Sequence, residues 1–146
     1  MTEDVAVELN AKEAWLANHP WETVVEINRE LCAKPETPHR PGPGYEATRQ
    51  IWETARQQRM TFREFLDLCR RCHAANPFAF FNGNTFARVL AKILEPVCQQ
   101  LPSLEATMLR TAAAHYVAGA IQARELLDVC RHVDLVLRQR NTTPAA

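Results

Sequence analysis

Residues 61–73 read TFREFLDLCRRCH, and this stretch decides what kind of fold the chain adopts. Thr61 and Glu64 have the spacing of a capping box, in which each side chain accepts a hydrogen bond from the other residue's backbone N–H, and Met60 precedes them at the staple position. An apolar stripe at helical spacing follows the cap: Phe62, Phe65, Leu66, Cys69, Cys72 and His73. The pattern predicts an amphipathic helix that begins at Phe62 and ends before Asn76-Pro77.

The same helical spacing recurs on both sides of this stretch. Trp21, Val24, Val25, Asn28, Leu31 and Cys32 form a matching stripe after Pro20, with Asn28 as a polar interruption. We expect further helices over residues 3–18, from Pro20 onward, over 45–59, from Asn84 or Thr85 to a bend or end at Pro96, and over about 104–138 after a Ser103 cap. Gly119 can divide the last of these into two helices. No segment requires a strand, so the chain is predicted to be an all-α, single-domain bundle of five to seven helices.

Proline and charge divide the sequence into parts. Residues 1–34 are expected to form a short, acidic N-terminal helical hairpin, residues 35–44 a Pro/Gly-rich connector, residues 45–140 the main bundle and residues 141–146 a tail. Residues 1–39 carry 3 Lys/Arg and 8 Asp/Glu, whereas residues 40–146 carry 14 and 9. We therefore expect the acidic hairpin to dock on the basic body.

The composition narrows the class of protein. A chain of 146 residues that is 47% hydrophobic and 23% charged suits one globular domain and excludes wholesale disorder, collagen, coiled coils and disulfide scaffolds. The longest apolar stretch, residues 112–121, is shorter than the roughly 20 residues of a membrane span. The acidic N-terminus lacks the pattern of a secretory signal, and five cysteines, an odd number, suggest free thiols. These features predict a cytoplasmic protein.

The sequence CRRCH at residues 69–73 is the one motif with chemical content. Cys-x-x-Cys-His is the pattern of c-type haem attachment, but here the helical phase places Cys69, Cys72 and His73 on the apolar stripe. We interpret them as core residues, because a free cysteine behaves as a small hydrophobe, and expect no cofactor. The alternative is a metal or redox sensor on Cys69, Cys72 and His73, completed by Cys98 or Cys130 from another helix.

A cluster of arginines indicates a second alternative. Six arginines fall within 23 residues: Arg49, Arg56, Arg59, Arg63, Arg70 and Arg71. Four of them recur every seven residues, which would suit a protein that binds the nucleic-acid backbone. The intervening Glu and Asp residues favour intrahelical ion pairs on a solvated surface instead.

Phenylalanines lie in a loop between two predicted helices. Phe78, Phe80 and Phe81 can form either a core plug or a docking site for a partner. Because no nucleophile motif, paired-carboxylate cluster or phosphate-binding glycine loop is present, we expect a non-enzymatic helical interaction module: an adaptor, a regulator or a small subunit of a larger complex. Its partner would be another protein or a second copy of the chain. Nucleic acid is the alternative partner, and a membrane is not expected.

Overall fold

The computed structural model describes residues 9 and 11–142. These residues form seven helices: α2 (Trp21–Leu31), α3 (Tyr45–Ala55), α4 (Phe62–Ala74), α5 (Asn82–Ile93), α6 (Glu95–Cys98), α7 (Ser103–Val117) and α8 (Ala123–Thr142). Within the described ranges no strand is formed beyond two isolated bridges, so the predicted all-α bundle is confirmed. None of the helices in this part of the chain is long and apolar enough to cross a membrane.

The helix α4 begins and ends as its local sequence predicts. Both hydrogen bonds of the capping box are present, from the Glu64 N–H to Thr61 Oγ1 (3.2 Å) and from the Thr61 N–H to Glu64 Oε1 (2.9 Å). The apolar stripe faces inward, and the side chains of Phe65, Leu66 and Cys69 have no exposed surface. The ends and the buried face of α4 are therefore determined by residues 61–74 themselves.

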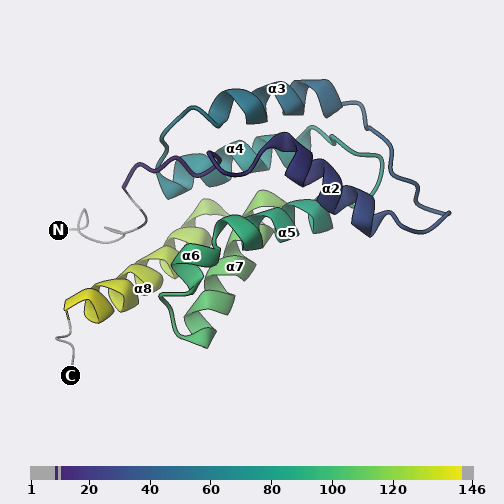
Figure 1. The fold of residues 1–146 in the computed structure, drawn as a ribbon. Coiled ribbons are helices and arrows are strands. Elements are labelled where there is room, and N and C mark those ends of the chain that lie inside the picture. Colours follow the sequence, from purple (N-terminus) through teal and green to yellow (C-terminus); the bar gives the residue numbers. More distant parts are fainter. Residues whose placement is uncertain (1–8, 10, 143–146) are drawn as a thin grey trace.

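The helices pack in successive layers (Figure 1). Helix α3 contacts α2 and α4; α2 packs on α5, and α4 packs on α7. Helix α8 packs on α7. One continuous apolar core runs through all these layers, from Leu9 to Leu137, so the acidic N-terminal part and the main bundle share it.

The prediction of a helix over residues 3–18 is wrong for residues 11–18, and residues 3–8 and 10 lie outside the described part. Glu13 instead forms an antiparallel bridge with Met60, with two backbone hydrogen bonds of 2.8 Å. The Trp15 indole stacks on Phe65 and donates to the Met60 carbonyl at 2.9 Å. These tertiary contacts outweigh a weak helical periodicity, because they give the backbone partners that a helix would otherwise supply.

Helix α5 begins earlier than the predicted cap at Asn84 or Thr85. Its first residue is Asn82, after Phe81 in a left-handed conformation (φ 63°). The Asn82 side chain accepts from the Phe78 N–H at 3.0 Å and donates to the Phe78 carbonyl at 2.8 Å. The segment Asn82-Gly83-Asn84 is thus the first turn of the helix.

The proline and glycine breaks of the C-terminal half fall where the sequence indicates. Pro96 lies in the short helix α6 that follows α5. Gly119, with φ 81°, separates α7 from α8, as in the divided alternative. Helix α8 extends to Thr142 and so includes the first two residues of the expected tail.

The Pro/Gly-rich connector contains turns at residues 35–36 and 43–44, and it is docked on the loop between α4 and α5. The N–H groups of Gly42 and Gly44 donate to the carbonyls of Pro77 (2.8 Å) and Asn76 (3.2 Å). A Cβ atom on Gly44 would lie 1.9 Å from the Ala75 carbonyl oxygen. The glycines are needed because the two backbones approach too closely for a side chain.

Candidate functional site

The cysteine-histidine motif lies in the core. Cys69 and Cys72 have no exposed surface, and burial raises the pKa of Cys72 to about 12 and that of Cys69 well above its usual value. The His73 ring packs edge-on against Phe86, and its partial burial lowers its pKa. At neutral pH both thiols are therefore protonated and poorly suited to bind a metal or attack an electrophile.

Cys98 and Cys130, the two candidates for a further ligand, are also buried. Across residues 9 and 11–142, no three His, Cys, Asp or Glu side chains are grouped so that they could hold a metal ion. The four thiols are buried among core side chains, and the His73 imidazole is partly buried beside Phe86.

The six arginines do not form one stripe. Arg49 pairs with Glu46 at 2.8 Å; this is an exposed contact within α3. Other arginines bind the N-terminal segment: Arg56 donates to the Ala17 carbonyl (3.1 Å), and Arg59 to the Lys12 carbonyl (2.8 Å).

The arginines of α4 have different partners. The guanidinium groups of Arg63 and Arg70 lie 5.6 Å and 4.7 Å from the ring centroid of Tyr116, which belongs to α7. Arg63 also pairs with Asp67 at 3.3 Å, whereas Arg71 is exposed. The seven-residue repeat is thus divided between two surfaces.

The three phenylalanines have separate environments. Phe78 is 1% exposed and stacks on Trp21, with ring centroids 5.7 Å apart, so it is part of the core and offers no surface to a partner. Phe80 is half-buried, and its carbonyl oxygen accepts a hydrogen bond from Asn28. Phe81 is 37% exposed and is the member of the group most accessible to a docking protein.

Asn28 sets the position of α2 against α5. Its side-chain amide donates to the Phe80 carbonyl at 2.8 Å and to Thr85 Oγ1 at 3.0 Å. Its Oδ1 lies 2.8 Å from Nδ1 of His39 in the connector. The residue that interrupts the apolar stripe therefore joins two helices, a loop and the connector through buried or partly buried polar contacts.

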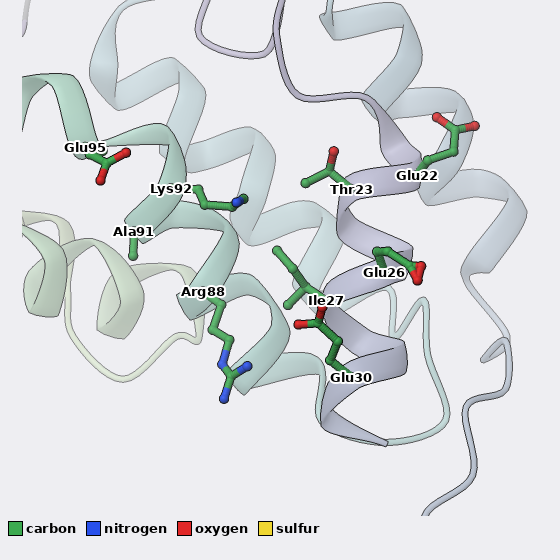
Figure 2. A pocket seen from close by; sticks show the side chains of 9 residues that line it. All are labelled: Glu22, Thr23, Glu26, Ile27, Glu30, Arg88, Ala91, Lys92 and Glu95. Atoms are coloured by element: carbon green, nitrogen blue, oxygen red, sulfur yellow. The ribbon is translucent and has the colours of Figure 1, made fainter. Parts of the chain in front are cut away.

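The two helices that Asn28 joins border an open groove of about 760 Å³ (Figure 2). We call it the α2–α5 groove. Its lining residues are Glu22, Thr23, Glu26, Ile27, Glu30, Arg88, Ala91, Lys92 and Glu95. None of them was among the candidate site residues predicted from the sequence.

The two sides of the groove carry opposite charge. Glu22, Glu26 and Glu30 form an acidic wall along α2, and Arg88 and Lys92 form a basic wall along α5. Each set repeats every four residues and so lies on one side of its helix. This spacing was the available signal in the sequence, but it did not reveal that the two helices are neighbours.

Thr23 and Ile27 of α2 form the floor beside the acidic wall, and Ala91 of α5 also lines the groove. Figure 2 shows Thr23 and Ile27 directed from α2 toward α5, and Lys92 extended from α5 toward α2. In the described part of the chain no ion pair of 4.0 Å or less joins the two walls; Glu26 pairs with Arg29 of its own helix. The charges of Glu22, Glu30, Arg88 and Lys92 thus remain accessible to a bound molecule, and Glu26 shares its charge with Arg29.

No protein-family model matches the chain, and neither the curated proteins nor the solved structures contain a significant match to it. The features that bear on function are therefore those of the chain's own surface, foremost the α2–α5 groove.

Proposed function

We propose that this chain is a non-enzymatic protein-interaction module that binds a helical segment of another protein in the α2–α5 groove. The observation that carries the proposal is a groove of about 760 Å³ with walls of opposite charge and a floor of small or aliphatic side chains. Binding of an amphipathic helix in a groove is a common mode of peptide recognition.

The dimensions suit a helix. Glu22 and Glu30 are eight residues apart, which corresponds to about 12 Å along α2. One helical turn rises about 5.4 Å, so roughly two turns of a bound helix can lie along this length of the groove. Small lining residues such as Thr23 and Ala91 allow a bound helix to approach the two helices closely.

The lining chemistry supports binding rather than catalysis. The lining residues include no histidine, cysteine or serine, so the groove offers none of the usual pairs of nucleophile and base. An adaptor or regulator in the cytoplasm fits this surface together with the five buried thiols.

Nucleic acid is a poorer candidate for the same groove. The three carboxylates of the acidic wall would repel phosphates. Of the arginines considered for that role, Arg49, Arg56 and Arg63 are paired with carboxylates of their own helices. A gel-shift assay at low salt should show no retardation of DNA or RNA.

The test of the proposed function blocks the groove. Ala91→Trp adds bulk to its lining, and Ala47→Trp, on the exposed side of α3, adds the same bulk elsewhere. Tagged wild type and both variants, each checked by circular dichroism, are used for crosslinking and quantitative mass spectrometry in cells of the source organism. We expect a protein that wild type and Ala47→Trp capture and Ala91→Trp does not. Equal capture by all three, or no specific capture by the wild type, contradicts the proposal.

A further inference from the structure

The two helices that border the α2–α5 groove run in a defined relative direction, and this distinguishes the two ends of the groove. Asn28, near the end of α2, meets Thr85, near the start of α5, while Glu22 at the start of α2 and Glu95 just after α5 line the same groove. The two helices therefore run antiparallel. One end of the groove, which we call the acidic end, is bordered by the carboxylates of Glu22 and Glu95.

The charges on both walls have the same repeat. Residues four apart on a helix are separated by about 6 Å along its axis. The carboxylates of the acidic wall have this spacing, and so do Arg88 and Lys92. A helix lying between the walls can present side chains with that same repeat on each of its two edges. A row of Lys or Arg along one edge and a row of Asp or Glu along the other would therefore match both walls over successive turns.

The acidic end favours one orientation of such a helix. The N-terminus of a helix carries partial positive charge, and its C-terminus carries partial negative charge. A bound helix is thus stabilised with its N-terminus beside Glu22 and Glu95, parallel to α2. A helix with the two charged edges exchanged regains its ion pairs only by turning around, and its partially negative C-terminus then lies at the acidic end.

We propose, on the basis of the function proposed above, that the natural occupant of the α2–α5 groove is a helix of a partner protein with two oppositely charged edges. Its Lys/Arg edge lies along the acidic wall, its Asp/Glu edge lies along Arg88 and Lys92, and its N-terminus lies at the acidic end. Small or aliphatic residues between the edges contact the floor. Docking of the groove on the same groove of a second copy is disfavoured by shape, since both surfaces would be concave.

The experiment uses the full chain and three designed probes. These are fluorescent 21-residue Ala/Leu-based helical peptides of identical composition, capped at both ends. The first has a Lys edge and a Glu edge in the proposed arrangement, the second has the edges exchanged, and the third has Lys and Glu mixed on both edges. Fluorescence anisotropy gives each Kd, and chemical shifts of the Ile27 and Ala91 methyl groups locate the bound peptide.

We expect the first peptide to bind at least about tenfold more tightly than the mixed peptide, through several ion pairs, and this preference to weaken with added salt. It should bind roughly two- to fivefold more tightly than the exchanged peptide, which keeps its ion pairs by turning around but places its C-terminus at the acidic end. The variant Arg88→Glu/Lys92→Glu should lose the preference. The variant Arg71→Glu/Arg124→Glu, which has the same change of charge on exposed residues outside the groove, should keep it.

Other results overturn this inference. They are equal binding of the three peptides, a preference that survives Arg88→Glu/Lys92→Glu, or no binding of the first peptide. A wild-type dimer in sedimentation that Arg88→Glu/Lys92→Glu dissociates would identify a second copy as the occupant instead. If Ala91→Trp still abolishes partner capture, these results reject only the charged-edge helix; if capture is unaffected by Ala91→Trp, the interaction function itself is rejected.

Discussion

At the scale of single residues, Glu53 of α3 takes the place of a side-chain cap at the start of α2. The first N–H of α2, on Trp21, donates to Glu53 Oε2 at 2.8 Å, while Pro20 before it makes no side-chain cap. Glu53→Ala should lower the free energy of unfolding by about 1 kcal/mol at neutral pH, as loss of a cap does. Urea unfolding would measure this, with the exposed Glu46→Ala as a control that changes stability by less than about 0.5 kcal/mol.

The contribution of Glu53 should also depend on pH. The Trp21 hydrogen bond, and next the neighbouring Arg56, hold the pKa of Glu53 below its usual value of 4.5. A carboxylate with a lowered folded-state pKa stabilises the protein above the unfolded pKa, and this contribution is lost as the pH falls through the folded pKa. The difference between wild type and Glu53→Ala should therefore be complete above pH 4.5 and shrink below it; a difference that grows in acid would contradict this role.

The five thiols provide a second prediction at this scale. All five cysteines are buried, and burial raises the pKa of Cys72 and Cys130 to about 12. Because thiolates react and buried thiols do not ionise, the native protein should react slowly with Ellman's reagent at pH 8. Five thiols per chain should react at once in guanidinium chloride. Rapid labelling of Cys69 or Cys72 in the native state would revive the redox alternative.

At the scale of elements, the connector depends on two glycines that lie against the loop after α4. Gly44→Ala places a Cβ 1.9 Å from the Ala75 carbonyl oxygen, which is backbone and cannot rotate away. We expect a loss of about 1–3 kcal/mol of stability, as in other overpacked sites. The matched control is Gly83→Ala in α5, whose Cβ would have its nearest contact at 3.8 Å and which should be neutral or stabilising by up to about 1 kcal/mol. Equal melting temperatures for the two variants would show that the connector is not tightly docked.

Helix α4 offers a test of the face that it buries. Leu66 has no exposed surface, whereas Arg71 on the same helix is exposed. Leu66→Asp places an unpaired charge in the core and should lower stability by at least about 3 kcal/mol or prevent folding. Arg71→Ala should change it by less than about 0.5 kcal/mol. Circular dichroism melts would compare them, and wild-type melting of Leu66→Asp would refute the assigned face.

At the scale of the whole molecule, the N-terminal part and the main bundle share one core. Trp21 stacks on Phe78 from the loop after α4, and Trp52 packs near Phe86 of α5. The acidic segment packs on the basic body. Several of the contacts are made by backbone groups, such as the Ala17 carbonyl that accepts from Arg56, and so do not depend on the opposite charges of the two parts.

We therefore expect the chain to unfold as one unit. Tryptophan fluorescence reports on the layers around α2 and α3, and far-ultraviolet circular dichroism reports on all the helices. The two signals should give the same urea midpoint in a two-state transition. An earlier fluorescence transition would show that the acidic part is a separately folding unit.

The amino-acid sequence by itself determined the helical class, both ends of α4, and the breaks at Pro96 and Gly119. These features depend on local physics: a capping box, an apolar period of 3.6 residues and the backbone restrictions of proline and glycine. The burial of Cys69 and Cys72 follows from the same periodicity.

Only the tertiary structure decided the rest. The bridge of Glu13 with Met60, the early start of α5 at Asn82 and the docked connector each depend on a backbone partner contributed by another segment. The α2–α5 groove likewise requires two helices that are separated by some 50 residues in the sequence and joined by Asn28 and Thr85. Side-chain periodicity shows which face of a helix is buried, but the choice of the helix that covers it rests on the packing of the whole core.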